Sequence, residues 1–217
     1  MTTECAACVG AIDHLPPGSM LVVPCVSWEQ YEELLTDLGD RHGLRVSYDR
    51  GRLQIMSPSD EHEEYGDSIL RLAQTLSEVL GVPLESRGSA TWKRGALQRG
   101  VEPDTCFYVA NAHRVIGRRR IDLDVDPPPD VVVEIDITNE SLSKFPIYAA
   151  LGVPEIWRYD GARVQMFTLS GDRYVSANES RFFPALSCSI LTEFLDASKT
   201  HGQTEALRRF RQRMNAR

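Results

Sequence analysis

A strand-like segment that carries two acids within an apolar run is the feature that most constrains this chain. Residues 131–137 read VVVEIDI, and such a run of β-branched residues is typical of a strand covered on both faces of a sheet. Because side chains alternate along a strand, Glu134 and Asp136 share one face. An unpaired carboxylate buried there costs on the order of several kcal/mol. We therefore expect a compensating cation, either a metal ion or a lysine.

A second acid lies in a similar setting, in the segment 102–104 (EPD) that leads into the apolar run 105–109. Asp104 and Glu134 fall on separate predicted strands that can be neighbours in one sheet. Oxygen ligands suit a hard cation such as Mg²⁺, which takes one or two carboxylates and keeps several waters. Such an ion neutralises charge on a phosphate and lowers the pKa of bound water. We predict that these two acids bind Mg²⁺, or Mn²⁺ in its place, for phosphodiester hydrolysis.

Lys144 is the candidate cation supplied by the protein, because it follows the acidic strand in the first turn of the next predicted helix. A lysine there opposes the helix dipole at a cost of about a few tenths of a kcal/mol or more. The carboxylates of Glu134 and Asp136 can offset this cost. Lys144 would then position the attacking water or bind the scissile phosphate, with Asp136 as a third metal ligand or as the partner of the lysine. The alternative is an ordinary surface lysine.

Acids and a histidine also open the long predicted helix, at residues 61–64 (EHEE). We expect His62 or Glu63 to reach the metal or the substrate. The alternative is that these acids only stabilise the positive end of the helix dipole. Lys93 precedes the strand of Asp104 and could contact phosphate, although a solvated surface lysine is the plainer interpretation.

Length and charge limit the fold and the partners. The chain has 217 residues, of which 42% are hydrophobic, and this is enough for one substantial core in one domain. The formal net charge of −7 argues against a protein that coats nucleic acid without specificity, although arginine clusters leave room for a local basic groove. No apolar run approaches the ~18 residues of a membrane span, and no signal-peptide pattern is present. We expect a cytoplasmic protein without membrane contact.

The five cysteines are scattered and odd in number, so a disulfide framework is not expected. Cys5 and Cys8 have the spacing of a redox or zinc pair. No second pair follows them, and a lone pair is a weak signal. We interpret these two cysteines as an isolated pair without a metal.

The sequence divides into three predicted parts. Residues 1–25 lack clear periodicity and form a mostly irregular lead, residues 26–198 form the main domain, and residues 199–217 hold a basic amphipathic helix from about Thr204 to Met214. The order of predicted elements in the main domain is α-β-β-α-β-β-α-β-β. Such an order indicates an α/β fold with a mixed sheet and flanking helices.

Local signals mark the ends of several predicted helices. Ser27 can cap the first helix, and Asp60 with Glu63 has capping-box spacing at the start of the long one. Gly81 is expected to end that long helix in the left-handed conformation. A short helix is expected near Leu191 to Leu195.

Taken together, these motifs resemble the Uma2 family of endonucleases, a branch of the PD-(D/E)xK nuclease superfamily. The resemblance runs from about Trp28 to Leu195, and it depends on the order and spacing of motifs that are each weak alone. These motifs are Met56-Ser57-Pro58 with Glu61-His62, Glu102-Pro103-Asp104, Val132-Val133-Glu134-Ile135, Lys144, Tyr148, Gly152-Val153-Pro154-Glu155-Ile156-Trp157 and Tyr159-Asp160.

The resemblance implies a restriction-endonuclease-like core over residues 26–198, with Asp104 and Glu134 in the metal-ligand positions. In the superfamily pattern a lysine stands two residues after the second acid, and Asp136 holds that place here. In Uma2 proteins the corresponding lysine lies instead on the helix that follows the acidic strand. Lys144 matches that position. A second departure is Ser47, where many members carry an acid before the hairpin turn. Both departures would lower the efficiency of catalysis. The set of Asp104, Glu134 and Lys144 is retained despite them.

Three functions follow from the sequence. The first is a Mg²⁺-dependent endonuclease that hydrolyses DNA. The second is a nucleic-acid-binding or interaction module that has the nuclease fold without activity, since fold does not fix function. The negative net charge and Asp136 in the place of the lysine favour this alternative. The third is a metal-dependent phosphoesterase that acts on RNA or nucleotides. A homodimer would suit the cutting of both strands of a duplex, because a two-fold axis relates two sites.

Overall fold

The computed structural model describes residues 12, 15–39, 43–137, 139–184 and 186–216. The strands are β1 (Met20–Val23), β2 (Arg45–Asp49), β3 (Arg52–Met56), β4 (Glu85–Gly88), β5 (Trp92–Arg94), β6 (Arg99–Val101), β7 (Thr105–Tyr108), β8 (Val131–Ile135), β9 (Glu155–Tyr159), β10 (Val164–Ser170) and β11 (Arg173–Ala177). The helices are α2 (Trp28–Leu38), α3 (Asp60–Leu80), α4 (Ala112–Val115), α5 (Phe145–Leu151), α6 (Cys188–His201) and α7 (Gln203–Asn215), with 3₁₀ turns η1 (Gly95–Leu97) and η2 (Leu142–Lys144). Cys5 and Cys8 lie outside the described residues.

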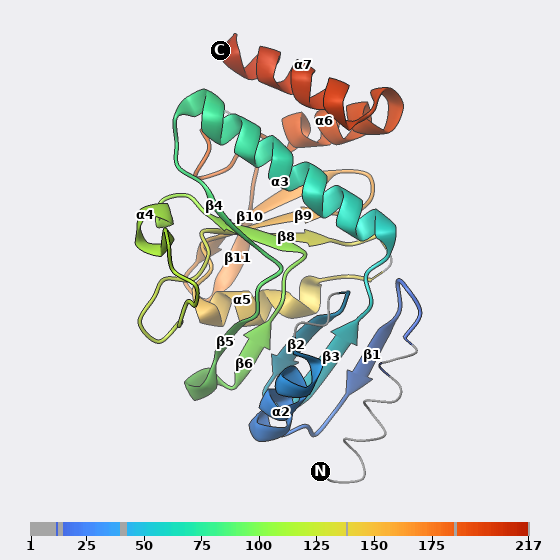
Figure 1. Ribbon diagram of the computed structural model, residues 1–217, viewed down its shortest axis with the longest axis vertical. Helices are drawn as coiled ribbons and strands as arrows, with labels where there is room; N and C mark the ends of the chain where they lie inside the picture. Colours follow the sequence, from blue (N-terminus) through green and yellow to red (C-terminus); the bar gives the residue numbers. More distant parts are fainter. Residues whose placement is uncertain (1–11, 13–14, 40–42, 138, 185, 217) are drawn as a thin grey trace.

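The strands form two sheets. The larger sheet has the order β11-β10-β9-β8-β7-β4, in which β8 and β9 are parallel and the other pairs are antiparallel. This mixed sheet with flanking helices confirms the predicted fold class (Figure 1). The smaller sheet has the order β1-β3-β2-β6-β5, and its pairs are all antiparallel. The sequence did not predict this separate sheet, nor that β4 and β5 would belong to different sheets.

The two faces of the larger sheet have separate cores. Helix α3 crosses one face, α6 packs on the same face against β10, and α7 packs on α3 and α6 (Figure 1). Phe107 and Trp157 belong to the core on this side. Helix α5 covers the other face, where its Tyr148 packs in one cluster with Val132. Because side chains alternate along β8, Glu134 lies on the α5 face together with Val132.

The ends of α3 agree only in part with the sequence prediction. Gly81 ends the helix with a left-handed φ of 64°, as predicted, since glycine adopts this conformation without strain. The predicted capping box of Asp60 and Glu63 is wrong, because the helix begins at Asp60 and Ser59 is the N-cap residue. The Ser59 side chain caps no backbone amide and instead lies 2.8 Å from Nδ1 of His62.

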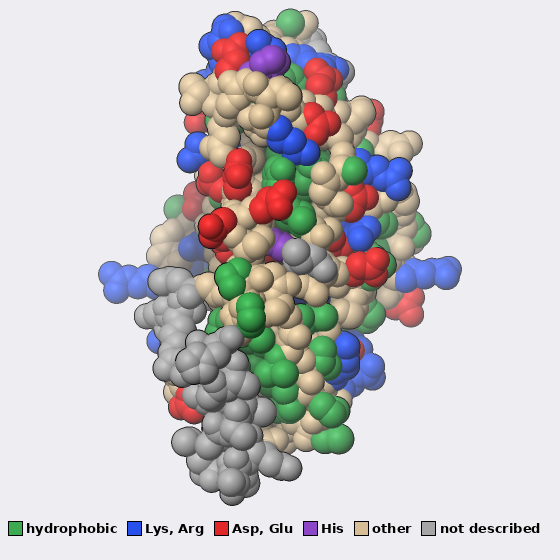
Figure 2. Space-filling view, turned by 90° about the vertical axis from the view of Figure 1, so that its right-hand side faces the viewer, with side chains coloured by type: hydrophobic (Ala, Val, Ile, Leu, Met, Phe, Trp, Pro, Cys, Tyr) green, Lys and Arg blue, Asp and Glu red, His purple; other side chains and the backbone are tan. Residues whose placement is uncertain are grey.

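The predicted irregular lead contains a strand that the sequence reading missed. β1 pairs antiparallel with β3, with Met20 opposite Met56. The strand lies at the edge of the smaller sheet, and Met20 and Val22 are each 40% exposed. Figure 2 views this side of the molecule, where hydrophobic side chains gather over the lower part and side chains of both charges mix over the upper part. No single-sign field therefore dominates this face.

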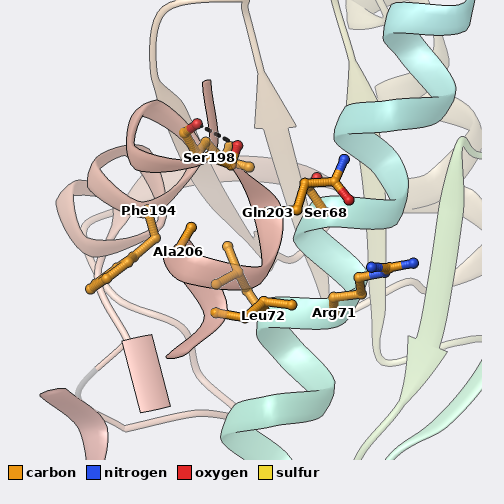
Figure 3. Close-up of a pocket in the computed structure, with 9 residues that line it drawn as sticks. Ser68, Arg71, Leu72, Phe194, Ser198, Gln203 and Ala206 are labelled. Carbon is orange, nitrogen blue, oxygen red and sulfur yellow. Dashed lines mark hydrogen bonds between the residues drawn. The ribbon is translucent and has the colours of Figure 1, made fainter. Parts of the chain in front are cut away.

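The C-terminal helices complete the core beside α3. Helix α6 is much longer than the short helix predicted near Leu191, and α7 lies close to the predicted basic helix. Phe210 of α7 is fully buried and packs edge-to-face on Phe194. A hollow remains between α3, α6 and α7 (Figure 3), and one of its lining groups is the buried hydroxyl of Ser68, which lacks a hydrogen-bond partner among the described residues.

The arginines of α7 are paired with acids rather than free for an anionic partner. Arg208 and Arg209 both bind Glu205 at 2.7 Å. The other two reach across to neighbouring helices, where Arg211 pairs with Glu78 and Arg213 with Glu193. These pairs are exposed, so each contributes little to stability. They do reduce the positive field of this helix.

Candidate active site

The candidate site lies where the chain passes from the smaller sheet to the larger one. β6 ends at Val101 and β7 begins at Thr105, so Glu102, Pro103 and Asp104 make the crossing. Oε2 of Glu102 accepts a hydrogen bond of 2.8 Å from the backbone N–H of Val46 in β2. The backbone N–H of Glu102 donates in turn to the carbonyl of Val46 at 3.0 Å. These hydrogen bonds fix the position of the crossing segment. Asp104 therefore lies directly before the first residue of β7, where the chain enters the larger sheet.

Asp104 and Glu134 lie side by side on neighbouring strands. β7 and β8 are antiparallel with Thr105 opposite Val133, and continuing this register places the two acids opposite each other. Oδ2 of Asp104 accepts a hydrogen bond of 2.7 Å from the backbone N–H of Ile135. Asp104 is 8% exposed and Glu134 is 1% exposed. Burial, together with the neighbouring Asp104 charge, raises the pKa of Glu134 to about 7 against the opposing effect of Lys144.

Lys144, the N-cap residue of α5, and Tyr148 within α5 hold Glu134. Nζ of Lys144 is 2.7 Å from Oε2 of Glu134, and the hydroxyl of Tyr148 donates to Oε1. Residues four apart on a helix lie on one face, and the 3₁₀ turn η2 runs directly into α5, so the N-cap residue and Tyr148 point the same way. Burial lowers the pKa of Lys144, but the charges of Glu134 and Asp104 raise it more, so its pKa lies above the ordinary value. The lysine is therefore an ammonium ion that points back at the acids.

Asp136 contacts neither of the partners predicted from the sequence, which were a metal ion and Lys144. Nε of Arg158 donates to Oδ2 of Asp136, and both carboxylate oxygens accept from the backbone N–H of Ser141 at 3.0 Å. The structure thus pairs Asp136 with an arginine of β9 rather than with Lys144. Within the described ranges, no group of three or more His, Cys, Asp or Glu side chains is arranged to hold a metal ion. The geometry brings together two candidate acidic ligands and not a third.

His62 and Glu63 contact residues other than the acid pair: Nδ1 of His62 lies 2.8 Å from the hydroxyl of Ser59, and Glu63 pairs with Arg45. His62 is 1% exposed, and its Nε2 is buried without a hydrogen-bond partner in the part of the chain that the structure describes. Oε1 of Glu63 is 2.6 Å from Nη2 of Arg45. Nε of Arg45 lies 3.7 Å from Oδ1 of Asp104. Glu63 therefore reaches the acid pair through Arg45.

Lys93 lies away from this group. Its Nζ is 2.6 Å from Oε1 of Glu32 on α2, and both side chains are partly exposed. This exposed ion pair fits the interpretation of Lys93 as a solvated surface residue rather than a phosphate contact.

Several polar residues of the site were not predicted as site residues from the sequence, where Ser47 appeared only as a departure from the family pattern. Gln54 of β3 accepts hydrogen bonds from Ser47 at 3.3 Å and from Ser143 at 3.2 Å, which connects the β2–β3 hairpin to the turn before α5. Arg45 and Ser47 alternate with apolar residues along β2. A strand shows the same alternation whether its polar face is turned toward solvent or toward a polar cleft. Only the fold shows that the polar face of β2 is turned toward a cleft.

These residues line a cleft between the hairpin and the larger sheet. Its empty volume is about 360 Å³. The lining residues are Met20, Arg45, Ser47, Gln54, Met56, Glu134, Ile135, Asp136, Asn139, Glu140, Ser141, Ser143 and Lys144.

The acids at this cleft fit a divalent cation. Oδ1 of Asp104 is buried and has no hydrogen-bond partner among the described residues. Each oxygen of Glu134 has one donor, and a carboxylate oxygen can accept a second. The unpartnered oxygen and the mutual repulsion of two buried acids are both relieved by a hard cation.

Comparison with known proteins places the chain in a family. The model of Uma2, described as "Putative restriction endonuclease", matches residues 28–195. The chain belongs to the Uma2 family. This membership supports a nuclease function. A search of curated proteins gave no match.

A solved structure is also similar to this Uma2 protein. It is described as a "putative nuclease belonging to DUF820" from Anabaena variabilis. The two are 14% identical with a TM-score of 0.46, and the match covers 68% of this chain and 89% of the other. In the described part of this Uma2 protein, no helix is both long enough and apolar enough to cross a membrane.

The Tyr148–Glu134 contact gives a first test of the site's structure in this Uma2 protein. Tyr148→Phe removes one donor from a buried carboxylate, and we expect the free energy of unfolding to fall by about 1–3 kcal/mol. Urea denaturation measures this loss. Tyr174→Phe is the matched control, because the hydroxyl of Tyr174 donates to a neutral acceptor, the carbonyl of Val153, and its loss costs about 0.5–1.5 kcal/mol. A smaller loss for Tyr148→Phe than for the control would contradict the contact.

Proposed function

We propose that this Uma2 protein is a metal-dependent endonuclease that hydrolyses DNA phosphodiester bonds, with Mg²⁺ as its ion. The observation that carries the proposal is the convergence of Asp104, Glu134 and Lys144. Glu134 and Lys144 line the cleft with Nζ of Lys144 2.7 Å from Oε2 of Glu134, and Asp104 lies opposite Glu134 in the register of β7 and β8. Family membership supports the nuclease class. The choice of ion and of DNA is our inference from the chemistry of the site.

Each residue of the set has a distinct part in the proposed reaction. Asp104 and Glu134 would hold the ion, which when bound lowers the pKa of a water and neutralises phosphate charge. Lys144 is a point charge on a flexible stem, and it lies where it can orient the attacking water or bind a phosphate oxygen. Tyr148 stays protonated because burial raises its pKa well above the ordinary value. Its O–H therefore donates to Oε1 of Glu134, and such a donor orients a ligand carboxylate.

A binding module without hydrolytic activity is the second candidate. Two observations favour it: both oxygens of Glu134 already have donors, and the described residues offer no third acid for the ion. Such a protein would bind nucleic acid and leave it intact. A phosphoesterase for RNA or nucleotides shares the proposed site and differs only in substrate.

Cleavage assays separate these candidates. Purified protein with Mg²⁺ or Mn²⁺ is expected to nick supercoiled plasmid, and EDTA is expected to stop the reaction. The same preparations are incubated with single-stranded RNA and with nucleotides. Nicking of plasmid alone supports the proposal, and hydrolysis of RNA or nucleotides alone replaces it with the phosphoesterase. Binding of a labelled duplex without any metal-dependent cleavage identifies the binding module.

A homodimer is part of the same proposal, because two sites related by a two-fold axis can cut both strands of a duplex. The expected result is a dimer mass by light scattering at the concentration of the cleavage assay. We also expect linear plasmid to appear early in the reaction. A monomer mass together with nicked circles as the lasting product would refute the dimer and leave the site unaffected.

A further inference from the structure

A buried arginine stands in the cleft with its hydrogen bonds incomplete. The side chain of Arg45 is 7% exposed. Its Nη1 donates to the carbonyl of Leu44 at 3.1 Å, and Nη2 is 2.6 Å from Oε1 of Glu63. Its Nε is buried and has no hydrogen-bond partner among the described residues. The nearest acceptor is Oδ1 of Asp104 at 3.7 Å, which is beyond hydrogen-bond length.

Nε of Arg45 and Oδ1 of Asp104 are buried atoms of opposite charge that lie 3.7 Å apart without a hydrogen bond, so each retains the capacity to bind a further partner. A buried donor or acceptor without a partner costs about 1–3 kcal/mol, and more when it is charged. Arg45 is also restrained at two other nitrogens, so the direction of its Nε–H is fixed. A guanidinium matches phosphate oxygens in both geometry and charge. The donor that Arg45 leaves open is therefore suited to an anionic oxygen that enters the cleft.

The charges around the cleft favour the same ligand. Arg45 and Lys144 supply two positive charges, and Asp104 and Glu134 supply two negative ones. Asp136 is neutralised by Arg158. Glu63 is 56% exposed at its side chain, and Glu140, which also lines the cleft, is exposed, so the charges of both are screened by solvent. A divalent cation at the two acids would leave the interior of the cleft positive, which attracts a phosphate group.

We propose that Arg45 binds a non-bridging oxygen of the phosphodiester through its Nε–H, and that Glu63 is the positioning residue that holds the guanidinium in place. This inference rests on the proposed function. Oδ1 of Asp104 lies 3.7 Å from Nε of Arg45. Once Asp104 serves as a ligand, the Nε–H of Arg45 can donate to the substrate. Arg45 then fixes the phosphate beside Lys144, from the opposite wall of the cleft.

Binding of inorganic phosphate to the Mn²⁺-loaded protein tests this role without cleavage. We expect calorimetry to show that Arg45→Gln weakens phosphate binding by about 10- to 100-fold, the loss of one charge-assisted hydrogen bond. Arg45→Lys keeps the charge and loses the planar fork, so we expect an intermediate affinity. Arg52→Gln is the control, because Arg52 is an exposed arginine on the adjacent strand β3. It should bind phosphate as the wild type does.

Mn²⁺ affinity distinguishes phosphate binding from a purely structural role. If Arg45 binds substrate, Arg45→Gln keeps or tightens Mn²⁺ binding, because a positive charge near Asp104 is lost, while kcat/KM on a duplex falls about 10- to 100-fold. If Arg45 only supports the fold, Mn²⁺ binding and thermal stability fall together with phosphate binding. That result, or equal phosphate binding in the wild type and in Arg45→Gln, would overturn the inference.

The same measurements separate this inference from the proposed function. A wild type that binds Mn²⁺ and phosphate, with phosphate lost in Arg45→Gln, supports the role of Arg45 even if no nucleic acid is cleaved. A wild type that cleaves DNA, with Arg45→Gln equal to it in KM and in phosphate affinity, retains the endonuclease and rejects Arg45 as its phosphate contact. If Arg45→Gln does not fold, the same measurements are made on Glu63→Gln. We expect Glu63→Gln to weaken phosphate binding with the arginine still present.

Discussion

Replacement of Glu134 by glutamine is expected to lower the rate of metal-dependent cleavage by about 10³-fold or more. A metal ion contributes several kcal/mol to the transition state of such a reaction, and each 1.36 kcal/mol is about tenfold in rate. Glutamine is close to glutamate in shape and keeps an acceptor for Tyr148, so the fold should persist while the charge that binds the ion is lost. Plasmid nicking at saturating Mn²⁺ measures the rate, and calorimetry measures the loss of Mn²⁺ binding.

Glu155→Gln is the matched control for this prediction. Glu155 is a fully buried glutamate of the neighbouring strand β9, and its carboxylate accepts from the indole of Trp157 and from the backbone of Arg181. Its replacement affects packing and hydrogen bonding but lies outside the acid pair. We expect this variant to cleave at a rate close to that of the wild type at a temperature where both are folded. Equal cleavage by Glu134→Gln and the wild type would reject Glu134 as a metal ligand.

Replacement of Asp136 by alanine is expected to destabilise the fold by about 3–5 kcal/mol, because it leaves the charge of Arg158 buried without its partner. The two side chains are 1% and 13% exposed. The backbone N–H of Ser141 also loses its acceptor. For a chain of this length the melting temperature should fall by about 6–20 °C. Thermal denaturation followed by circular dichroism measures the fall.

A second measurement on this variant, its affinity for Mn²⁺, distinguishes a structural role of Asp136 from a metal-binding role. If Asp136 acts through Arg158 and Ser141, the folded fraction of Asp136→Ala binds Mn²⁺ at low temperature with nearly wild-type affinity. The double variant Asp136→Ala/Arg158→Met should recover part of the lost stability, because it removes the unpaired charge. An unchanged melting temperature together with lost Mn²⁺ binding would instead make Asp136 the third ligand.

The sequence was sufficient to predict the acid pair and the lysine, because each follows from a short-range rule. The alternation of side chains along β8 places Glu134 on one face of the sheet. Because that face is buried, the carboxylate needs a positively charged partner. The lysine at the start of the next helix must return to the same edge of the sheet, since a helix that follows a strand packs back on it. The caps at Ser27 and Gly81 are local in the same way, and both are present in the structure.

The division into two sheets could not be predicted, because it depends on one crossing. The extended segment around Pro103 reads as a continuous approach to β7, yet it leaves one sheet and enters the other. Nothing in the period of the side chains distinguishes a strand that stays in its sheet from one that changes sheets. The pairing of β1 with β3 is similarly long-range, and four residues are too few for a clear periodic signal.

The partners of the buried charges were also beyond the sequence. Arg158 lies in β9 and reaches Asp136 only because β8 and β9 are parallel, with Glu134 opposite Arg158. Arg45 lies in the other sheet and reaches Asp104 only because the chain crosses beside it. Such pairs are set by topology, and an arginine in an alternating strand reads as a solvent-facing residue until the topology is known.

Crystals soaked with Mn²⁺ test the central claim most directly. The account predicts an anomalous-scattering peak between the carboxylates of Asp104 and Glu134, with the amine of Lys144 beside it. The peak should be absent from crystals of Glu134→Gln grown in the same way. Soaked wild-type crystals with no peak at the acid pair, or with the ion bound only elsewhere, would contradict the claim that these two side chains form a metal site.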